Sequence, residues 1–230
     1  MSPLNNSACR VLLCYVTDRR SLPATESREV REILLLKIRD AAAAGVDWIQ
    51  IREKDLSGRD YGLLAREALH RAAKSQVNNA AATRILLNDR LDAALSEGAG
   101  GVHLGEDSLP LPEAKRLASA QAQNQDFLIG VSCHSLEAAR SAASGAADYL
   151  FFGPVFATPS KVAFGAPQGL ERLAEVCRAV AIPVLAIGGI TLANVSACLA
   201  AGASGIAAIR LFQDAPDMSS LVQSLRRLPR

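Results

Sequence analysis

Gln50, Arg52 and Lys54 are three polar side chains at alternate positions of one short segment. At a spacing of two they leave the same face of an extended chain, so they converge if that face points into a cavity. Two cations beside an amide suit an anionic group, because a guanidinium can hold phosphate oxygens through two parallel hydrogen bonds. The segment therefore predicts an anion site. The alternative is a solvated strand end in which the cations pair with Glu53 and Asp55.

Acidic residues follow two other apolar runs and suit a hard cation. Asp89, in Asn88-Asp89, is the type of oxygen ligand that Mg²⁺ favours beside a diphosphate, where water and phosphate oxygens complete the coordination. Asp107, in the pair Glu106-Asp107, offers a second ligand. The alternative for Asp89 is the N-cap of a helix that starts near Arg90. The three histidines lack the spacing of metal ligands, so we expect no zinc site.

Lys161 lies with Thr158 and Ser160 in the longest expected loop, residues 157–168. Hydroxyls and an ammonium together make an anion site, and a long loop with prolines and glycines suits an active-site lid. The alternative is a lysine that is simply solvated.

The pair Gly188-Gly189 ends an apolar run just before a helix whose expected N-cap is Thr191. Bare amides at such a helix start can hold a phosphate monoester. Arg210, after the last apolar run, is expected to stand opposite. The alternative is a tight turn that merely requires glycine.

Histidine supplies the candidate group for proton transfer. His134 stands where a strand ends and a helix begins, a position from which an imidazole can act as a general acid or base, although a single histidine there is more often structural. His103 stands between Val102 and Leu104, which indicates a core setting and a weaker candidate.

A repeated phrase locates the elements that must position these side chains. An Ala-rich helical stretch ends in small residues and an apolar strand follows at once, in four copies that begin at Ala44, Gly98, Gly145 and Gly202. Glycine just past a helix end supplies a left-handed C-cap, and a continuously apolar strand after it is typical of a parallel strand buried on both faces. Each copy predicts a helix-to-strand turn.

The other apolar runs complete a set of eight expected strands, near residues 11–17, 48–52, 84–88, 101–104, 127–132, 149–153, 183–188 and 205–211. Amphipathic stretches of helical length lie between them, such as residues 30–44, 59–74, 135–144 and 170–180. This alternation predicts an α/β fold, a (β/α)8 TIM barrel, as a single domain over residues 1–230 with 1–10 as a flexible extension. A doubly wound open sheet is the alternative. In a barrel the site lies at the carboxyl ends of the strands, where the polar residues fall.

Composition excludes several classes of protein. The chain has 25 Lys+Arg and 23 Asp+Glu, a net charge of +2, without the basic excess of a nucleic-acid-binding or membrane-surface protein. Five scattered cysteines without a Cys-x-x-Cys pair argue against a disulfide framework. Polar N-terminal residues and the lack of a long apolar run predict neither a secretory leader nor a membrane span. We expect a cytoplasmic protein that binds small phosphorylated molecules, and homo-oligomer formation stays open.

Six stretches in order, within residues 15–212, resemble the thiamine-phosphate synthase family and its relatives, the thiazole tautomerases. They are Gln50-Ile51-Arg52-Glu53-Lys54, Asn88-Asp89, Gly101-Val102-His103-Leu104-Gly105, Gly130-Val131-Ser132-Cys133-His134, residues 153–161 and Ala186-Ile187-Gly188-Gly189-Ile190.

The resemblance implies that 4-amino-2-methyl-5-hydroxymethylpyrimidine diphosphate is joined to a thiazole phosphate, giving thiamine phosphate and pyrophosphate with the help of Mg²⁺. It implies that Asp89 binds Mg²⁺ and that the pyrimidine diphosphate is held by Gln50, Arg52, Lys54, Asn88 and Lys161. Ser132 would contact the leaving group or the pyrimidine. The thiazole would meet Thr158 and Ser160, and its phosphate would meet Gly188, Gly189 and Arg210. The expected catalytic groups are Arg52, Lys54, Ser132, His134 and Lys161.

One position departs from the synthases, because Ser108 stands where they carry a second aspartate for Mg²⁺. A hydroxyl is a poorer ligand than a carboxylate, so Asp107 replaces it, Asp89 binds alone, or the chemistry is metal-free. The tautomerases often have serine here and use the histidine that matches His134, but they commonly lose the diphosphate-binding residues that this chain keeps. We favour the synthase. A tautomerase and a non-catalytic regulator that binds thiamine precursors are the alternatives.

Overall fold

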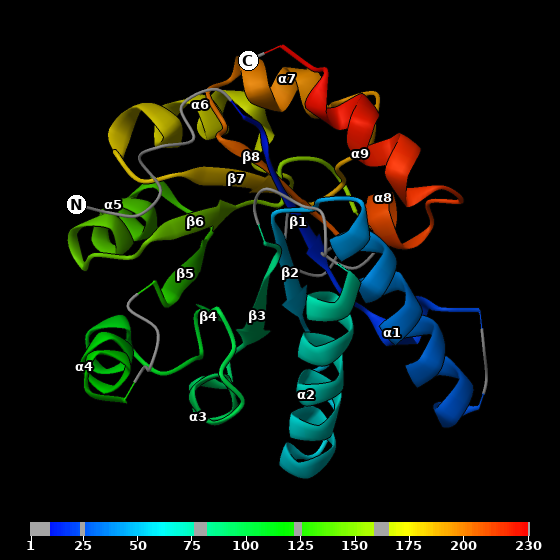
Figure 1. Cartoon of the computed structure of the whole chain (residues 1–230). Helices are drawn as coiled ribbons and strands as arrows, with labels where there is room; N and C mark the ends of the chain where they lie inside the picture. Colours follow the sequence, from blue (N-terminus) through cyan, green and yellow to red (C-terminus); the bar gives the residue numbers. More distant parts are fainter. Residues whose placement is uncertain (1–9, 24–25, 76–81, 122–125, 159–165, 230) are drawn as a thin grey trace.

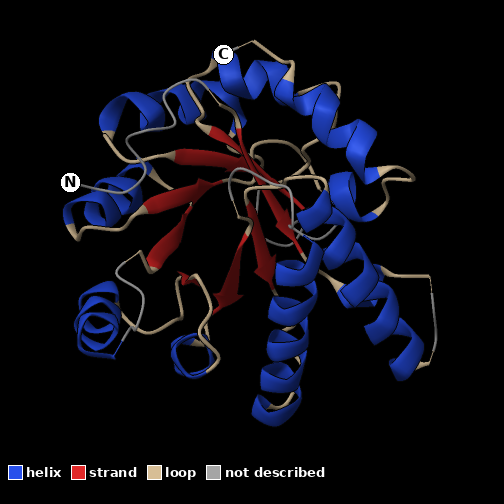
Figure 2. Cartoon of the chain, viewed as in Figure 1, coloured by secondary structure: helices blue, strands red, loops and turns tan. Residues whose placement is uncertain are grey.

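The computed structural model describes residues 10–23, 26–75, 82–121, 126–158 and 166–229, and it forms a closed barrel of parallel strands (Figures 1 and 2). The strands are β1 Leu12–Val16, β2 Trp48–Ile51, β3 Arg84–Asn88, β4 Gly101–Leu104, β5 Leu128–Cys133, β6 Tyr149–Phe152, β7 Val184–Ile187 and β8 Gly205–Ala208. The last strand pairs with the first, from Leu12↔Gly205 to Tyr15↔Ala208. Because this pairing leaves no open edge, the predicted TIM barrel is confirmed and the open sheet is wrong.

Helices surround the strands on the outside (Figure 2). They are η1 Arg19–Ser21, α1 Ser27–Ala43, α2 Gly58–Ser75, α3 Leu91–Ser96, α4 Leu111–Gln121, α5 Leu136–Ser144, α6 Gly169–Ala179, α7 Val195–Ala200, α8 Arg210–Gln213 and α9 Met218–Arg226. In the part of the chain that the structure describes, none of them is long and apolar enough to cross a membrane. The expected extension, residues 1–10, lies outside the described residues except for Arg10.

The last strand is shorter than the sequence predicts. It ends at Ala208 rather than near residue 211, because the chain turns at Ile209 into the short helix α8. Arg210 is therefore the first residue of a helix and not the end of a strand.

Alternate residues of each strand divide between two cores, which explains the continuously apolar runs. In β1, Leu12, Cys14 and Val16 belong to the barrel interior, whereas Leu13 and Tyr15 pack outward beneath the helices. The interior is completed by Trp48, Leu86, Leu128, Tyr149, Phe151, Leu185 and Ala207. Gln50 and Asn88 stand two residues after the interior Trp48 and Leu86, nearer the carboxyl ends of β2 and β3.

Three of the four helix-to-strand turns have the expected left-handed glycine, at Gly45, Gly98 and Gly202 with φ of 83°, 69° and 100°. The fourth differs, because Gly145 has a φ of −75° and Ala146 takes the left-handed value of 64°. The glycine serves a different purpose there. A Cβ at Gly145 would lie 2.9 Å from Leu111 Cδ2, so its missing side chain makes room for α4.

Aspartates at the turns fasten neighbouring strands at the amino-terminal end of the barrel. Leu13 N donates to Asp47 Oδ2 at 2.7 Å, and Ile129 N donates to Asp148 Oδ2 at 2.7 Å. Arg226 of α9 adds an ion pair to Asp47 at 2.7 Å. These bonds lie at the end opposite the polar strand termini, so stability and chemistry are served by different ends.

Candidate active site

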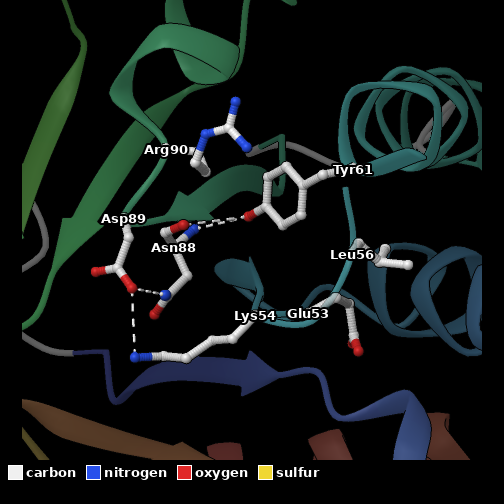
Figure 3. Close-up of a pocket in the computed structure, with 7 residues that line it drawn as sticks. All are labelled: Glu53, Lys54, Leu56, Tyr61, Asn88, Asp89 and Arg90. Atoms are coloured by element: carbon white, nitrogen blue, oxygen red, sulfur yellow. Dashed lines mark hydrogen bonds and ion pairs between the residues drawn. The ribbon is translucent and has the colours of Figure 1, made fainter. Parts of the chain in front are cut away.

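A chain of polar contacts joins the carboxyl ends of β2 and β3 (Figure 3). Gln50 Nε2 donates to Asn88 Oδ1 at 3.1 Å, and Asn88 Nδ2 donates to Asp89 Oδ2 at 2.6 Å. Lys54 Nζ pairs with the same carboxylate oxygen at 3.3 Å. Gln50 and Asn88 are buried and Lys54 is exposed, so this chain of contacts runs from the barrel interior to its mouth.

Asp89 is the centre of this arrangement and receives donors on both oxygens. Oδ1 accepts hydrogen bonds from Gly105 N at 3.2 Å and from Ser108 Oγ. Its φ of 61° lies in the left-handed region, which aspartate adopts more readily than most residues. The alternative of an N-cap is wrong, because Arg90 occupies that position of α3.

The electrostatics of the mouth favour the ionised form of Asp89. Partial burial raises the pKa of this carboxyl, but the hydrogen bond from Ser108 and the charge of Lys54 outweigh it, so the pKa lies below its ordinary value. A cavity of about 200 Å³ opens beside the carboxylate and is lined by Glu53, Lys54, Leu56, Tyr61, Asn88, Asp89 and Arg90 (Figure 3). An anion or a hydrated cation can enter here from solvent.

The turn after β4 presents Ser108, and not Asp107, to this group. Ser108 N donates to Gly105 O at 3.3 Å, which closes a turn with Glu106 and Asp107 at its exposed centre. Within the described residues, no cluster of three or more His, Cys, Asp or Glu side chains could hold a metal ion. Asp89 is the carboxylate that Ser108 and Lys54 contact, and a metal role for Asp107 stays a prediction.

The cations of the first motif do not pair with their acidic neighbours. Glu53 and Asp55 both bind Arg19, at 3.2 and 2.5 Å. Lys54 pairs with Asp89 instead, and in the described chain Arg52 has no ion-pair partner. The solvated-strand alternative is therefore wrong for the pairing that it predicted.

A buried network fixes the backbone around Arg52. Thr17 Oγ1 donates to Glu53 Oε1 at 2.6 Å and accepts from Arg52 N at 3.0 Å. Glu53 is 2% exposed, and this burial raises its pKa even though Arg19 and Thr17 donate to it. Sequence reasoning missed Thr17 and assigned Glu53 no role of its own. Thr17, which directly follows an apolar run on β1, was the available signal.

The interior below the mouth holds a second polar group. His103 Nδ1 lies 3.1 Å from Tyr149 OH, and His103 Nε2 lies 2.9 Å from Ser132 Oγ. The imidazole packs against Phe151 with ring centroids 4.1 Å apart. Burial lowers the pKa of His103 to about 3, so the ring is neutral at physiological pH. The core setting predicted for His103 is confirmed, whereas Tyr149 was missed; its register with Phe151 on the inward face of β6 was the signal.

His134 lies at the rim, half-buried, after β5. Its Nδ1 contacts the carbonyl oxygen of Gly153 at the end of β6. A carbonyl can only accept, so Nδ1 carries a proton and Nε2 of the neutral ring carries the lone pair. The contact uses Nδ1 and leaves Nε2 without a hydrogen-bond partner among the described residues.

Gly188 and Gly189 follow β7, at the same end of the barrel as Lys54, with φ of 92° and 66°. A Cβ at Gly188 would lie 2.5 Å from Pro154 Cβ, so close packing alone requires glycine there. The expected N-cap, Thr191, is wrong: α7 starts at Val195, and Thr191 N donates instead to Asn194 Oδ1 at 2.8 Å. A turn therefore separates Thr191 from the start of α7, and the side chain of Asn194 closes this turn.

The remaining predicted site residues are placed only in part. Thr158 is described and half-buried, at the end of the segment that follows β6. Ser160 and Lys161, with most of the predicted lid, lie outside the described residues. Arg210 is exposed at the start of α8. The described structure therefore brings together Gln50, Lys54, Asn88, Asp89 and Ser108, and separately Ser132 and His103.

The sequence from residue 15 to residue 212 matches the family described as thiamine monophosphate synthase. This chain belongs to the thiamine monophosphate synthase family. The chain is 44% identical over 186 residues to a thiamine-phosphate synthase of Methanoculleus marisnigri, covering 81% of this chain and 83% of the relative. It is 37% identical over 214 residues to one of Roseiflexus sp., covering 93% and 83%.

A solved structure agrees with this assignment. The thiamine phosphate pyrophosphorylase from Pyrococcus furiosus superposes with a TM-score of 0.77 at 31% identity, covering 95% of each chain. The resemblance stated for the family from six short stretches is thus confirmed over nearly the whole barrel.

Proposed function

We propose that this member of the family is a thiamine-phosphate synthase, a transferase that joins the pyrimidine diphosphate to the thiazole phosphate and releases pyrophosphate. The observation that carries the proposal is the linked set of Gln50, Asn88, Asp89 and Lys54 at the mouth of the barrel. Amide groups and an ammonium on a preorganised rim suit a pyrimidine that carries a diphosphate.

The chemical task is to stabilise the charge that develops on the leaving group. As the bond from the pyrimidine methylene carbon to the diphosphate oxygen breaks, negative charge collects on the departing oxygens. Lys54 is exposed, so its ammonium can turn from Asp89 toward those oxygens, and Arg52 has no ion-pair partner in the described residues that would compete. The thiazole nitrogen then forms the new bond to the methylene carbon. Lys161 and Ser160 stay part of this proposal.

Mg²⁺ belongs to the proposal with Asp89 as its protein ligand. The carboxylate fits: it is ionised, its side chain is 30% exposed, and it borders the cavity. Because Mg²⁺ keeps several waters and is often held by one or two carboxylates together with substrate phosphates, one aspartate suffices for an ion that arrives with the diphosphate. When bound, the metal would neutralise charge on the leaving diphosphate. Asp107 is retained only as a second ligand to be tested.

The direct test is incubation of the purified chain with both substrates and Mg²⁺, with thiamine phosphate measured by chromatography. Lys54→Met should lower kcat/KM by about 10²-fold, since it removes a donor to the developing charge. Lys115→Met is the matched control, because Lys115 binds Asp148 at the other end of the barrel. No product from the unmodified chain would overturn the proposal.

Ser108 and the geometry of His134 favour one second candidate, a thiazole tautomerase. The lone pair on His134 Nε2 can accept a proton at the rim without a metal. His134→Asn should then stop isomerisation of thiazole carboxylate phosphate, a loss of ~10² to 10⁴-fold. The tautomerase would be selected if the unmodified chain showed no condensation but catalysed an isomerisation that depends on His134.

A cytoplasmic location completes the proposal. The described cysteines, Cys14, Cys133, Cys177 and Cys198, are free thiols, as in a reducing compartment.

A further inference from the structure

Three polar groups stand in a row inside the barrel, directly below the mouth. Tyr149 OH, the two ring nitrogens of His103 and Ser132 Oγ are linked by contacts of 3.1 and 2.9 Å. Tyr149 and His103 are buried and Ser132 is half-buried, so the row runs from the closed interior toward the cavity end. The proposed function leaves the first two members without a task.

The direction of the hydrogen bonds follows from the environment of Tyr149. Its ring is packed against Trp48 and Phe151, with centroids 4.5 and 5.4 Å away, and the residue is 0% exposed. Among the described residues, His103 is the one hydrogen-bond partner of the hydroxyl. A phenol donates better than it accepts, and a buried O–H without an acceptor is unfavourable. Tyr149 therefore donates to His103 Nδ1.

The remaining bonds are then fixed in turn. A neutral imidazole that accepts at Nδ1 carries its proton on Nε2, so Nε2–H donates to Ser132 Oγ. The serine oxygen has accepted from the histidine, and its own hydrogen must point elsewhere. Ser132 follows Leu128 and Gly130 on the inward face of β5, so that hydrogen is available to a ligand at the mouth.

We propose that Tyr149 and His103 are positioning residues that orient the Ser132 hydroxyl as a hydrogen-bond donor to oxygens of the substrate diphosphate. This inference rests on the proposed function and deepens it. In this role the histidine is not a general base. Its Nε2–H group donates a hydrogen bond to Ser132 Oγ, and the serine keeps its own proton. The serine acts as a donor and not as a nucleophile.

The first experiment determines the tautomer of His103 in the unmodified chain by ¹⁵N NMR. We expect the proton on Nε2 and a lone pair on Nδ1. A proton on Nδ1 would overturn the inference, because Ser132 would then donate to the ring. The spectrum requires no turnover. It can therefore contradict the hydrogen-bonded relay from Tyr149 through His103 to Ser132 without bearing on the proposed function.

The second experiment is a double-mutant cycle on condensation. Ser132→Ala should lower kcat/KM by roughly 10 to 100-fold, the range for a hydrogen bond to a charged group. Tyr149→Phe should lower it by about 10-fold alone and by nothing further in the Ser132→Ala background, since it acts through Ser132. Additive losses would show a merely structural role and overturn the inference. Titration with inorganic pyrophosphate gives the same comparison without turnover.

Two controls separate positioning from folding. Tyr15→Phe removes another buried hydroxyl, one that donates to Gln213 at 2.9 Å outside the barrel interior, and should leave kcat/KM unchanged. His103→Gln keeps an N–H near the place of Nε2, whereas His103→Asn is too short to reach Ser132. Gln should rescue activity relative to Asn, and equal loss in both variants would contradict the relay.

Discussion

Asp89 receives donors from Ser108, Gly105, Asn88 and Lys54, and the position of Ser108 makes metal use directly testable. Ser108→Asp places a second carboxylate against the first, where two like charges repel without a cation. We expect this variant to unfold at a lower temperature in metal-free buffer and to regain stability as Mg²⁺ is added, because a ligand that binds the folded state stabilises it. Differential scanning fluorimetry across a Mg²⁺ series measures this.

The same variant should change condensation. Ser108→Asp should lower the Mg²⁺ concentration for half-maximal rate on the order of 10-fold, because a carboxylate is the better hard-cation ligand, and Asp89→Ala should nearly abolish the reaction. Asp107→Ala tests the proposed second ligand: an unchanged Mg²⁺ requirement means that Asp89 binds alone, and a raised requirement means that Asp107, which is exposed at the centre of the turn, takes part. Condensation that survives Asp89→Ala would rule out the metal assignment.

His103 should make stability depend on pH. Burial lowers the pKa of His103 to about 3. Between about pH 6.5 and 3 this residue is therefore protonated in the unfolded chain and neutral in the folded chain. Stability from this residue is present above pH 6.5 and is lost as the pH falls. For this group alone, the free energy of unfolding should drop by about 2 kcal/mol between pH 7 and pH 5.

The measurement is urea unfolding of the unmodified chain and of His103→Gln at both pH values. Gln does not titrate, so the variant should lack this part of the drop. An equal pH dependence in both proteins would show that His103 is not neutral and buried in solution.

Sequence reasoning identified most of the rim residues because each follows an apolar run, and strand ends must meet at one end of a barrel. It could not find how they pair. Lys54 pairs with Asp89 rather than with Glu53 because Arg19, at the start of η1, already binds Glu53 and Asp55. Such choices are set by tertiary contacts that no local pattern contains.

At the scale of elements, the turn between α5 and β6 carries avoidable strain. Ala146 adopts a φ of 64°, which costs a residue with a Cβ roughly 1 to 2 kcal/mol. Ala146→Gly removes that cost but adds entropy to the unfolded chain, so we expect the free energy of unfolding to rise by up to about 1 kcal/mol. The urea midpoint reports the change.

Gly45→Ala provides the opposite control. Gly45 has a φ of 83° and nothing within 4 Å of an added Cβ, so only backbone strain is introduced. It should lower the free energy of unfolding by about 1 to 2 kcal/mol. A loss of stability in Ala146→Gly would contradict this account of the turn.

The helices and strands were largely predictable because every strand of a parallel barrel is buried on both faces and so requires an apolar run. The wrong predictions concern where elements begin or end. Ile209 and Leu211 continue the apolar run of β8, but the chain turns into α8. Thr191 has the residue type of an N-cap, but the side chain of Asn194 closes the turn before α7. The apolar pattern alone does not mark where β8 ends or where α7 begins.

For the whole molecule, Arg226 of α9 fastens the C-terminal helix to the amino-terminal end of the barrel. Its guanidinium donates to Val11 O, to Gly45 O at 2.8 Å and to Asp47 Oδ2 at 2.7 Å. Arg226→Met should lower the free energy of unfolding by about 3 kcal/mol, because it leaves partly buried acceptors unpaired. Denaturant unfolding measures this loss.

Condensation should be unaffected by the same change wherever the variant is folded, since Asp47 lies before β2 and Arg52 lies after it. A lower kcat at a temperature well below the midpoint would refute the separation of stability and chemistry between the two ends. Arg227→Met is the control, because within the described residues the guanidinium of this neighbour bonds to Gln223, one helical turn away.

The Tyr149 ring occupies space that Gly130 leaves empty. A Cβ at Gly130 would lie 2.0 Å from Tyr149 Cζ, and the two residues face each other across β5 and β6. The missing side chain of Gly130 on β5 therefore accommodates the large ring of Tyr149 on β6. A larger residue at position 130 would displace the phenol ring, and a smaller residue at position 149 would leave a cavity. The sizes of the residues at positions 130 and 149 are therefore coupled, so a larger residue on β5 is tolerated only together with a smaller one on β6.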